Sequence, residues 1–170
     1  GGTFVLCTSL RAMKGLSAAL RPLLDTPIFV QGELPKTPLL ETFKNTECAT
    51  LVASMSFWEG VDVPGSALRL VIIDRIPFPV PSDPLVVARG RGVEARGKSA
   101  FIHYHLPQAA LTLKQGFGRL LRSRTDIGVV AVLDGRIQSR GYGSVLKRSI
   151  PPAVQSDDLA DVKRFFERTT

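Results

Sequence analysis

Hydrophobic residues along this chain gather in five short runs, separated by segments of a different period. The runs are nearly continuous and rich in β-branched residues, and they cover residues 4–8, 27–31, 50–53, 68–74 and 129–134. Continuous apolar runs of this length are typical of strands that are covered on both faces. The pattern therefore predicts five buried strands.

Between these runs, apolar residues recur at spacings of three and four. This period predicts helices over residues 12–24, 37–43, 85–96 and 106–122. Asp83 and Pro84 mark the start of the third, because Asp is a favoured N-cap and Pro suits the first helical position. Strands that alternate with helices predict an α/β fold, with a mostly parallel central sheet and helices on both faces.

Length and composition limit the possible classes of protein. A chain of 170 residues, 44% hydrophobic and 22% charged, suits one folded core and is short for two. No run approaches the ~18 apolar residues that span a bilayer, and the N-terminus lacks the basic region of a signal peptide. The two cysteines suit a reducing cytoplasm. Because the chain has no initiator Met, we expect it to be a piece of a longer protein.

The net charge of +7 is concentrated in one stretch of the chain. Residues 85–124 carry eight basic groups against Glu94 alone, whereas residues 1–84 carry seven basic and eight acidic groups. A local basic excess is expected where a protein meets phosphates. A solvated basic face that only aids solubility is the alternative.

Small polar residues follow three of the predicted strands. Thr8 and Ser9 follow the first, Gln31 and Gly32 the second, and Ser54 the third. Ligands of open parallel sheets bind at the carboxyl ends of the strands. Ordinary turn and N-cap roles are the alternative for each of these residues.

The helix predicted over residues 106–122 has a polar arc opposite its apolar stripe. The arc holds five residues at spacings of four and three: Gln108, Thr112, Gln115, Arg119 and Arg122. Gly116 and Gly118 lie inside the helix, where each costs roughly 1 kcal/mol relative to Ala. The pattern indicates that something approaches this face closely. An ordinary amphipathic helix is the alternative.

Three strings in this chain resemble helicase motifs. Residues 115–122, QGFGRLLR, fit Q-x-x-G-R-x-x-R and resemble motif VI of superfamily 2 helicases. Residues 56–65, SFWEGVDVPG, resemble motif V in the E-G-V-D form of the DinG/XPD branch. The strand that ends in Thr8 and Ser9, with the helix after it, is similar to motif IV. The resemblance covers roughly residues 3–150 and, within this branch, is greatest to the bacterial YoaA type.

The resemblance implies a RecA-like fold for residues 1–150, with a tail helix in residues 151–170. It implies the second motor domain of an ATP-dependent DNA helicase of DNA repair or replication. Arg122 would be the arginine finger, Arg119 would reach the nucleotide, and Gln115 would place the γ-phosphate or the attacking water. Four further residues would belong to the ATP site: Glu59, Gly60, Asp62 and Gly118. Glu59 and Asp62 have an alternative role as turn acids that bind local backbone N–H groups.

The same resemblance implies partners and cofactors. Thr8, Ser9 and Ser54 would contact the backbone of single-stranded DNA. The chain has no G-x-x-x-x-G-K-[ST] loop and no D-E-A-H-like string. ATP and Mg²⁺ would therefore be bound mainly by the first RecA-like domain of the same protein, and the isolated fragment would be inactive. An iron–sulfur cluster is expected in that other part, with no metal site here. The protein would be bacterial, cytoplasmic and nucleoid-associated.

A helix is also predicted over residues 156–168, with Ser156 as its N-cap. Four of its residues are candidates for docking a partner: Phe165, Phe166, Arg164 and Arg168. The resemblance suggests the chi subunit of the bacterial clamp loader. Packing of this helix on the α/β core is the alternative.

Two other classes of protein compete with the motor domain. A doubly wound nucleotide-binding enzyme is disfavoured, because no G-x-G-x-x-G follows any predicted strand. A protein-interaction module, which docks the helicase on a replisome partner and has no activity of its own, is the second alternative.

Overall fold

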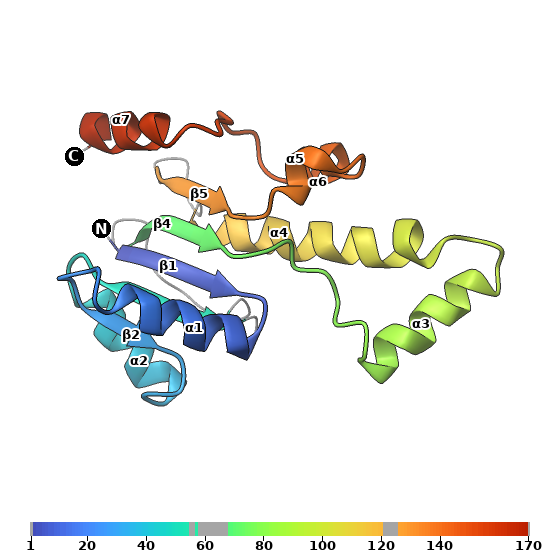
Figure 1. Cartoon of the computed structure of the whole chain (residues 1–170), viewed down its shortest axis with the longest axis horizontal. Helices are drawn as coiled ribbons and strands as arrows, with labels where there is room; N and C mark the ends of the chain where they lie inside the picture. Colours follow the sequence, from blue (N-terminus) through green and yellow to red (C-terminus); the bar gives the residue numbers. More distant parts are fainter. Residues whose placement is uncertain (1, 55–56, 58–67, 121–125, 170) are drawn as a thin grey trace.

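The computed structural model describes residues 2–54, 57, 68–120 and 126–169, with the backbone alone for Arg119. Its centre is a sheet of five strands: β1 (Gly2–Cys7), β2 (Ile28–Val30), β3 (Thr50–Ser54), β4 (Leu68–Ile73) and β5 (Val129–Val132). The strand order is β2-β3-β1-β4-β5, and every neighbouring pair is parallel (Figure 1). The five predicted strands are confirmed.

Helices cover both faces of this sheet, as the sequence predicts. They are α1 (Leu10–Leu20), α2 (Lys36–Lys44), α3 (Pro84–Glu94), α4 (Leu106–Leu120), α5 (Arg136–Ser139), α6 (Gly143–Ser149) and α7 (Leu159–Thr169). A π-helical turn, η3 (Phe101–His105), leads directly into α4. In Figure 1, α3 and the start of α4 extend away from the sheet, at the end where β1 and β4 point.

Successive side chains of β1 point to opposite faces of the sheet, so they contribute to two separate layers of the core. Phe4 and Leu6 are fully buried in the larger layer, which α2, α4 and α6 complete. Val5 and Cys7 face the smaller layer, where Met13 of α1 packs on them. Burial raises the pKa of the Cys7 thiol to about 12, so this thiol stays protonated and is a packing group.

The boundaries predicted for two helices are wrong. The helix predicted over residues 12–24 begins at Leu10, with Ser9 as its N-cap, and ends at Leu20. Pro22 accounts for the early end, since a proline has no N–H to donate and its ring clashes with the preceding turn. The tail helix begins at Leu159, because the Asp158 carboxylate accepts the N–H of Ala160. Ser156 instead accepts the N–H of Asp158, one turn before the helix.

A side chain of β4, Arg69, contacts the tail helix α7. Arg69 donates a hydrogen bond of 2.6 Å to the Thr169 hydroxyl, and its guanidinium lies over the ring of Phe166. Phe165 packs edge-on against Phe166. None of the α7 residues is fully buried. The helix is therefore anchored at its last turn.

A buried carboxylate joins the end of β5 to the proline-rich connector that follows β4, residues 74–83. Asp134 accepts the backbone N–H of Ile76 at 2.9 Å, the backbone N–H of Arg136 at 3.0 Å, and hydrogen bonds from Nε and Nη2 of the Arg136 guanidinium at 2.9 and 2.6 Å. These bonds, the Arg136 side chain above all, lower the pKa of Asp134 to about 2. The hydrogen bond from Ile76 fixes the connector to a residue that lies 58 positions further along the chain.

We expect Asp134→Ala to lower the free energy of unfolding by about 2–3 kcal/mol, because it leaves the Ile76 N–H without its acceptor. Because the pKa of Asp134 is lower in the folded protein than in the unfolded chain, its carboxylate stabilises the fold at pH values above the ordinary Asp pKa. This stabilisation is lost as the pH falls through the pKa of the folded state. The difference between wild type and variant should therefore shrink between about pH 4 and pH 2.

Urea titrations at neutral and acid pH measure this difference. Asp157→Ala is the control, since Asp157 is exposed and should change the unfolding free energy by less than about 0.5 kcal/mol. Equal effects of the two substitutions would contradict the role given to Asp134.

Candidate nucleic-acid and nucleotide interface

The carboxyl ends of neighbouring strands bring Thr8, Ser9 and Ser54 to one edge of the sheet. Cys7, just before Thr8, is the register partner of Ser54. Ser9 caps α1 by accepting the N–H of Ala12 at 3.1 Å. The amino end of a helix favours an anion, so this edge suits a phosphate group.

Each of these residues also has a structural bond within the chain. The Thr8 N–H and hydroxyl donate to the two oxygens of Asp74, at 2.8 and 3.3 Å. The Ser54 N–H and hydroxyl both donate to the side-chain oxygen of Gln31, at 2.7 and 2.8 Å. These bonds fix the positions of the two hydroxyls. The role of Asp74 was missed, although its position directly after a buried strand is a usable signal.

The helix α4 places its two faces as its sequence predicts. Its apolar stripe is buried: Leu106, Ala109, Ala110, Leu113, Phe117 and Leu120. On the other side Gln115 is exposed, and Thr112 donates its hydroxyl to the Gln108 carbonyl at 3.0 Å. Arg119 lies in the same helix.

Gly118 faces open space on α4. Among the described residues, no atom lies within 4 Å of the position that a Cβ would take there. The packing of the described residues therefore gives no reason for a glycine at this position. Gly128, which precedes β5, contrasts with it, since a Cβ there would lie 2.6 Å from the Arg69 carbonyl.

Four predicted site residues lie outside the described part of the chain. They are Glu59, Gly60, Asp62 and Arg122. In the described ranges, no three His, Cys, Asp or Glu side chains gather in a way that could hold a metal ion. No helix in these ranges has the length and apolar character needed to cross a membrane.

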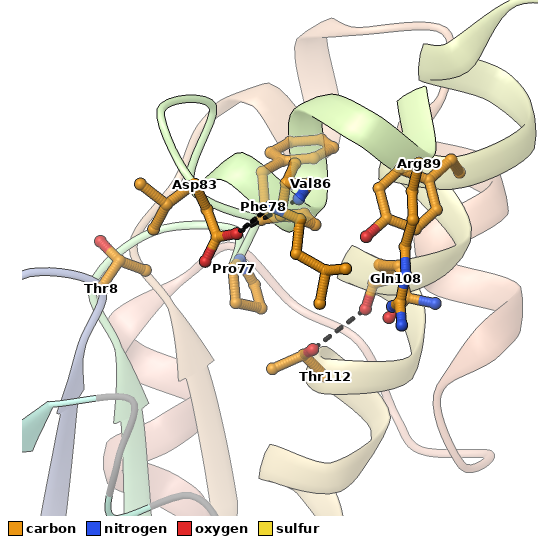
Figure 2. A pocket seen from close by; sticks show the side chains of 12 residues that line it. Thr8, Pro77, Phe78, Asp83, Val86, Arg89, Gln108 and Thr112 are labelled. Carbon is orange, nitrogen blue, oxygen red and sulfur yellow. Dashed lines mark hydrogen bonds between the residues drawn. The ribbon is translucent and has the colours of Figure 1, made fainter. Parts of the chain in front are cut away.

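An open pocket of about 310 Å³ lies beside the strand edge (Figure 2). Its walls come from Thr8, the proline-rich connector that follows β4, η3, α3 and α4. Asp83 points its carboxylate at the first turn of α3, where it accepts the N–H groups of Leu85 and Val86. The sequence does not predict this pocket, because the residues that form its walls are distant from one another in the chain.

Comparisons with known proteins match the chain to one family. The model of the helicase C-terminal domain family matches residues 1–153. The chain is 46% identical over 166 residues to the ATP-dependent DNA helicase YoaA of Escherichia coli, covering 98% of this chain and 26% of that protein. It is 46% identical over 168 residues to the ATP-dependent helicase DinG of Mycobacterium tuberculosis, covering 99% and 25%. The chain thus spans about a quarter of the length of these curated relatives.

Two solved structures share the fold. The structure of S. tokodaii Xpd4 matches with a TM-score of 0.60 and 20% identity, covering 90% of this chain and 30% of that chain. An XPD helicase structure matches with a TM-score of 0.62 and 19% identity, covering 86% and 27%. At this identity the likeness concerns the fold alone, and it confirms the predicted RecA-like α/β fold.

We expect Gly118→Ala to leave the free energy of unfolding unchanged or to raise it by up to about 1 kcal/mol, because Ala is the better helix former and open space surrounds the site. Gly128→Ala should instead lower it by more than about 2 kcal/mol, because the backbone of β4 blocks the added methyl group. Thermal and urea unfolding of both variants test the contrast. A destabilised Gly118→Ala variant would show that this glycine serves packing within the chain.

Proposed function

The chain belongs to the helicase C-terminal domain family, and from this premise we propose that residues 1–150 are the second RecA-like motor domain of an ATP-dependent DNA helicase acting in DNA repair or replication. The observation that carries the proposal is the outer face of α4. There the exposed Gln115 and the uncovered Gly118 lie within the Q-x-x-G-R-x-x-R string, which the packing of the core does not explain.

This face suits a nucleotide held by another domain. Phosphoryl transfer depends mainly on positioning and on neutralising the charge of the γ-phosphate. We assign Arg122 as the arginine finger and Arg119 as a second phosphate contact, since a guanidinium stays charged and grips phosphate oxygens with two donors. Gln115 orients the γ-phosphate or the attacking water. Gly118 gives the partner surface room to approach.

The remaining part of the ATP site completes this proposal. We assign Glu59, Gly60 and Asp62, which lie outside the described residues, to the coupling between the nucleotide and the DNA. ATP and Mg²⁺ are held mainly by the first RecA-like domain, because this chain has no phosphate-cradling lysine loop. We place the family's iron–sulfur cluster in that other domain as well, since no cysteine cluster occurs here.

The strand edge suits single-stranded DNA. Thr8 and Ser54 hold their hydroxyls in fixed positions, and Ser9 lies at the amino end of α1. Such groups bind phosphates without regard to sequence. The basic stretch of residues 85–124 adds attraction over a longer range.

For the tail helix we propose docking of a partner protein, the chi subunit of the clamp loader. Phe165 and Phe166 are half-buried, and Arg164 and Arg168 are exposed beside them. Arg69 occupies one side of Phe166 and so sets the orientation of α7, whereas Phe165 and Arg168 would meet the partner. This role adds to the motor function. As a full alternative it would make the chain an interaction module with no activity of its own.

We expect Arg122→Ala in the complete protein to lower ATP hydrolysis by about 10³-fold or more while ATP binding stays within a few-fold of wild type. Steady-state hydrolysis at saturating single-stranded DNA measures the first, and titration with a fluorescent ATP analogue the second. Arg124→Ala removes the same charge outside the motif and should keep most of the activity. Hydrolysis by Arg122→Ala within about threefold of wild type would overturn the assignment.

We expect Ser9→Asp to weaken binding of single-stranded DNA by roughly tenfold without loss of stability. Aspartate is as good an N-cap as serine, but its charge repels a phosphate at the same place. Thr26→Asp is the control, because Thr26 is exposed just before β2, at the opposite edge of the sheet.

Fluorescence anisotropy over a range of salt concentrations measures this binding. The logarithm of wild-type affinity should fall with a slope of about −0.7 per phosphate neutralised. If Ser9→Asp and Thr26→Asp bound DNA with equal affinity, or if affinity did not depend on salt concentration, the proposal that DNA binds at this edge would be wrong.

A further inference from the structure

The pocket beside the strand edge combines apolar walls with a few polar groups. Pro77 and Val86 line it from the connector and from α3, and the ring of Tyr104 lines it from η3. Arg89 and Gln108 add a guanidinium and an amide. At about 310 Å³ it lies at the lower limit of ordinary small-molecule sites. A pocket of this size and composition suits one flat, polar-edged ring.

Three polar groups of this pocket have no partner among the described residues. The Arg89 guanidinium, the Gln108 amide and the Tyr104 hydroxyl make no hydrogen bond or ion pair there. Figure 2 shows the Arg89 side chain reaching down from α3 toward Gln108 on α4. The other polar groups differ, since Thr8 is bonded to Asp74 and Asp83 caps α3. The three unpaired groups therefore remain for a ligand.

We propose that this pocket binds one unstacked base of the single-stranded DNA that the strand edge holds. A nucleobase offers a π-face to the Tyr104 ring and to the apolar walls, and its edge offers acceptors and donors to Arg89 and Gln108. Thr8 belongs both to the pocket and to the strand edge, so a base can enter while its phosphate lies at that edge. The inference rests on the function proposed above and deepens it.

Two other occupants fit the pocket less well. A phosphate group needs several cationic or N–H donors, whereas Arg89 is the single cation among the residues that line this pocket. The adenine of ATP belongs to a nucleotide whose phosphates we assign to Gln115 and to the first RecA-like domain, whereas Thr8 joins this pocket to the strand edge that we assign to DNA. Binding of an ATP analogue, measured in the test below, distinguishes the two occupants.

The test compares two oligonucleotides of equal length, oligo-dT and a strand with abasic sites in place of the thymines. Both present the same phosphates, so their difference in affinity for the complete protein reports the bases. We expect wild type to prefer oligo-dT by about tenfold, in keeping with the stacking of a single base. Arg89→Ala and Tyr104→Leu should remove most of this preference. Tyr104→Leu should bind the abasic strand almost as wild type does, and Arg89→Ala should bind it no more weakly than a variant that loses the same charge elsewhere on α3.

Two further variants separate base recognition from charge and from folding. Arg91→Ala removes the same charge from the same helix outside the pocket, so it should weaken binding of both strands equally. Tyr104→Phe keeps the ring and should retain the preference to within about threefold. Circular dichroism confirms that each variant is folded, and affinity for a fluorescent ATP analogue should be unchanged in all of them.

The outcomes distinguish the two levels of the proposal. No difference between Arg89→Ala and Arg91→Ala, or a wild type that binds both strands equally, would overturn the base pocket and leave the motor function standing. Weaker binding of the ATP analogue with unchanged DNA binding would reassign the pocket to the nucleotide. A wild-type protein that binds neither strand would overturn the proposed function itself.

Discussion

Parallel pairing of five strands is the constraint on which the rest of this structure depends. Every strand carboxyl end lies at the same edge, so residues that follow β1, β3 and β4 in sequence become neighbours in space. Asp74 illustrates the consequence, since it reaches across 66 positions to hold Thr8. In an antiparallel sheet, these residues would be divided between two edges.

Parallel pairing also requires long crossovers, and here the crossover between β4 and β5 contains much of the proposed chemistry. It includes the connector, α3, η3 and α4. Asp134 fixes the connector against the end of β5, and the apolar stripe of α4 packs on the sheet. One face of α4 therefore supplies stability, which leaves Gln108 and Gln115 to face outward.

The sequence predicts those features of the fold that arise from local patterns. The five strands are continuous apolar runs, and the α3 cap follows from Asp83 next to Pro84. The ends of α1 and the start of α7 are harder to predict from the sequence, because each depends on a competition between adjacent residues that can cap or break a helix. Pro22 is visible in the sequence, but the apolar pair Leu23 and Leu24 extends the helical period past it, and both side chains are exposed in the structure.

The candidate site divides in the same way. The outer face of α4 can be predicted from the sequence, because helical spacing determines which residues lie on it. The pocket is not, since its walls lie between Thr8 and Thr112 and meet only through the tertiary fold. The partners of Thr8 and Ser54 are long-range hydrogen bonds, and no local pattern indicates them.

We propose that this domain works in a motor that couples ATP hydrolysis to single-stranded DNA. The most direct measurement is the rate of ATP hydrolysis by the complete protein with and without a single-stranded oligonucleotide. We expect a rate that rises severalfold and saturates as the strand is added, because a domain with the proposed sites would contact the strand and the nucleotide at once. A rate that is independent of DNA, or no hydrolysis under either condition, would contradict it.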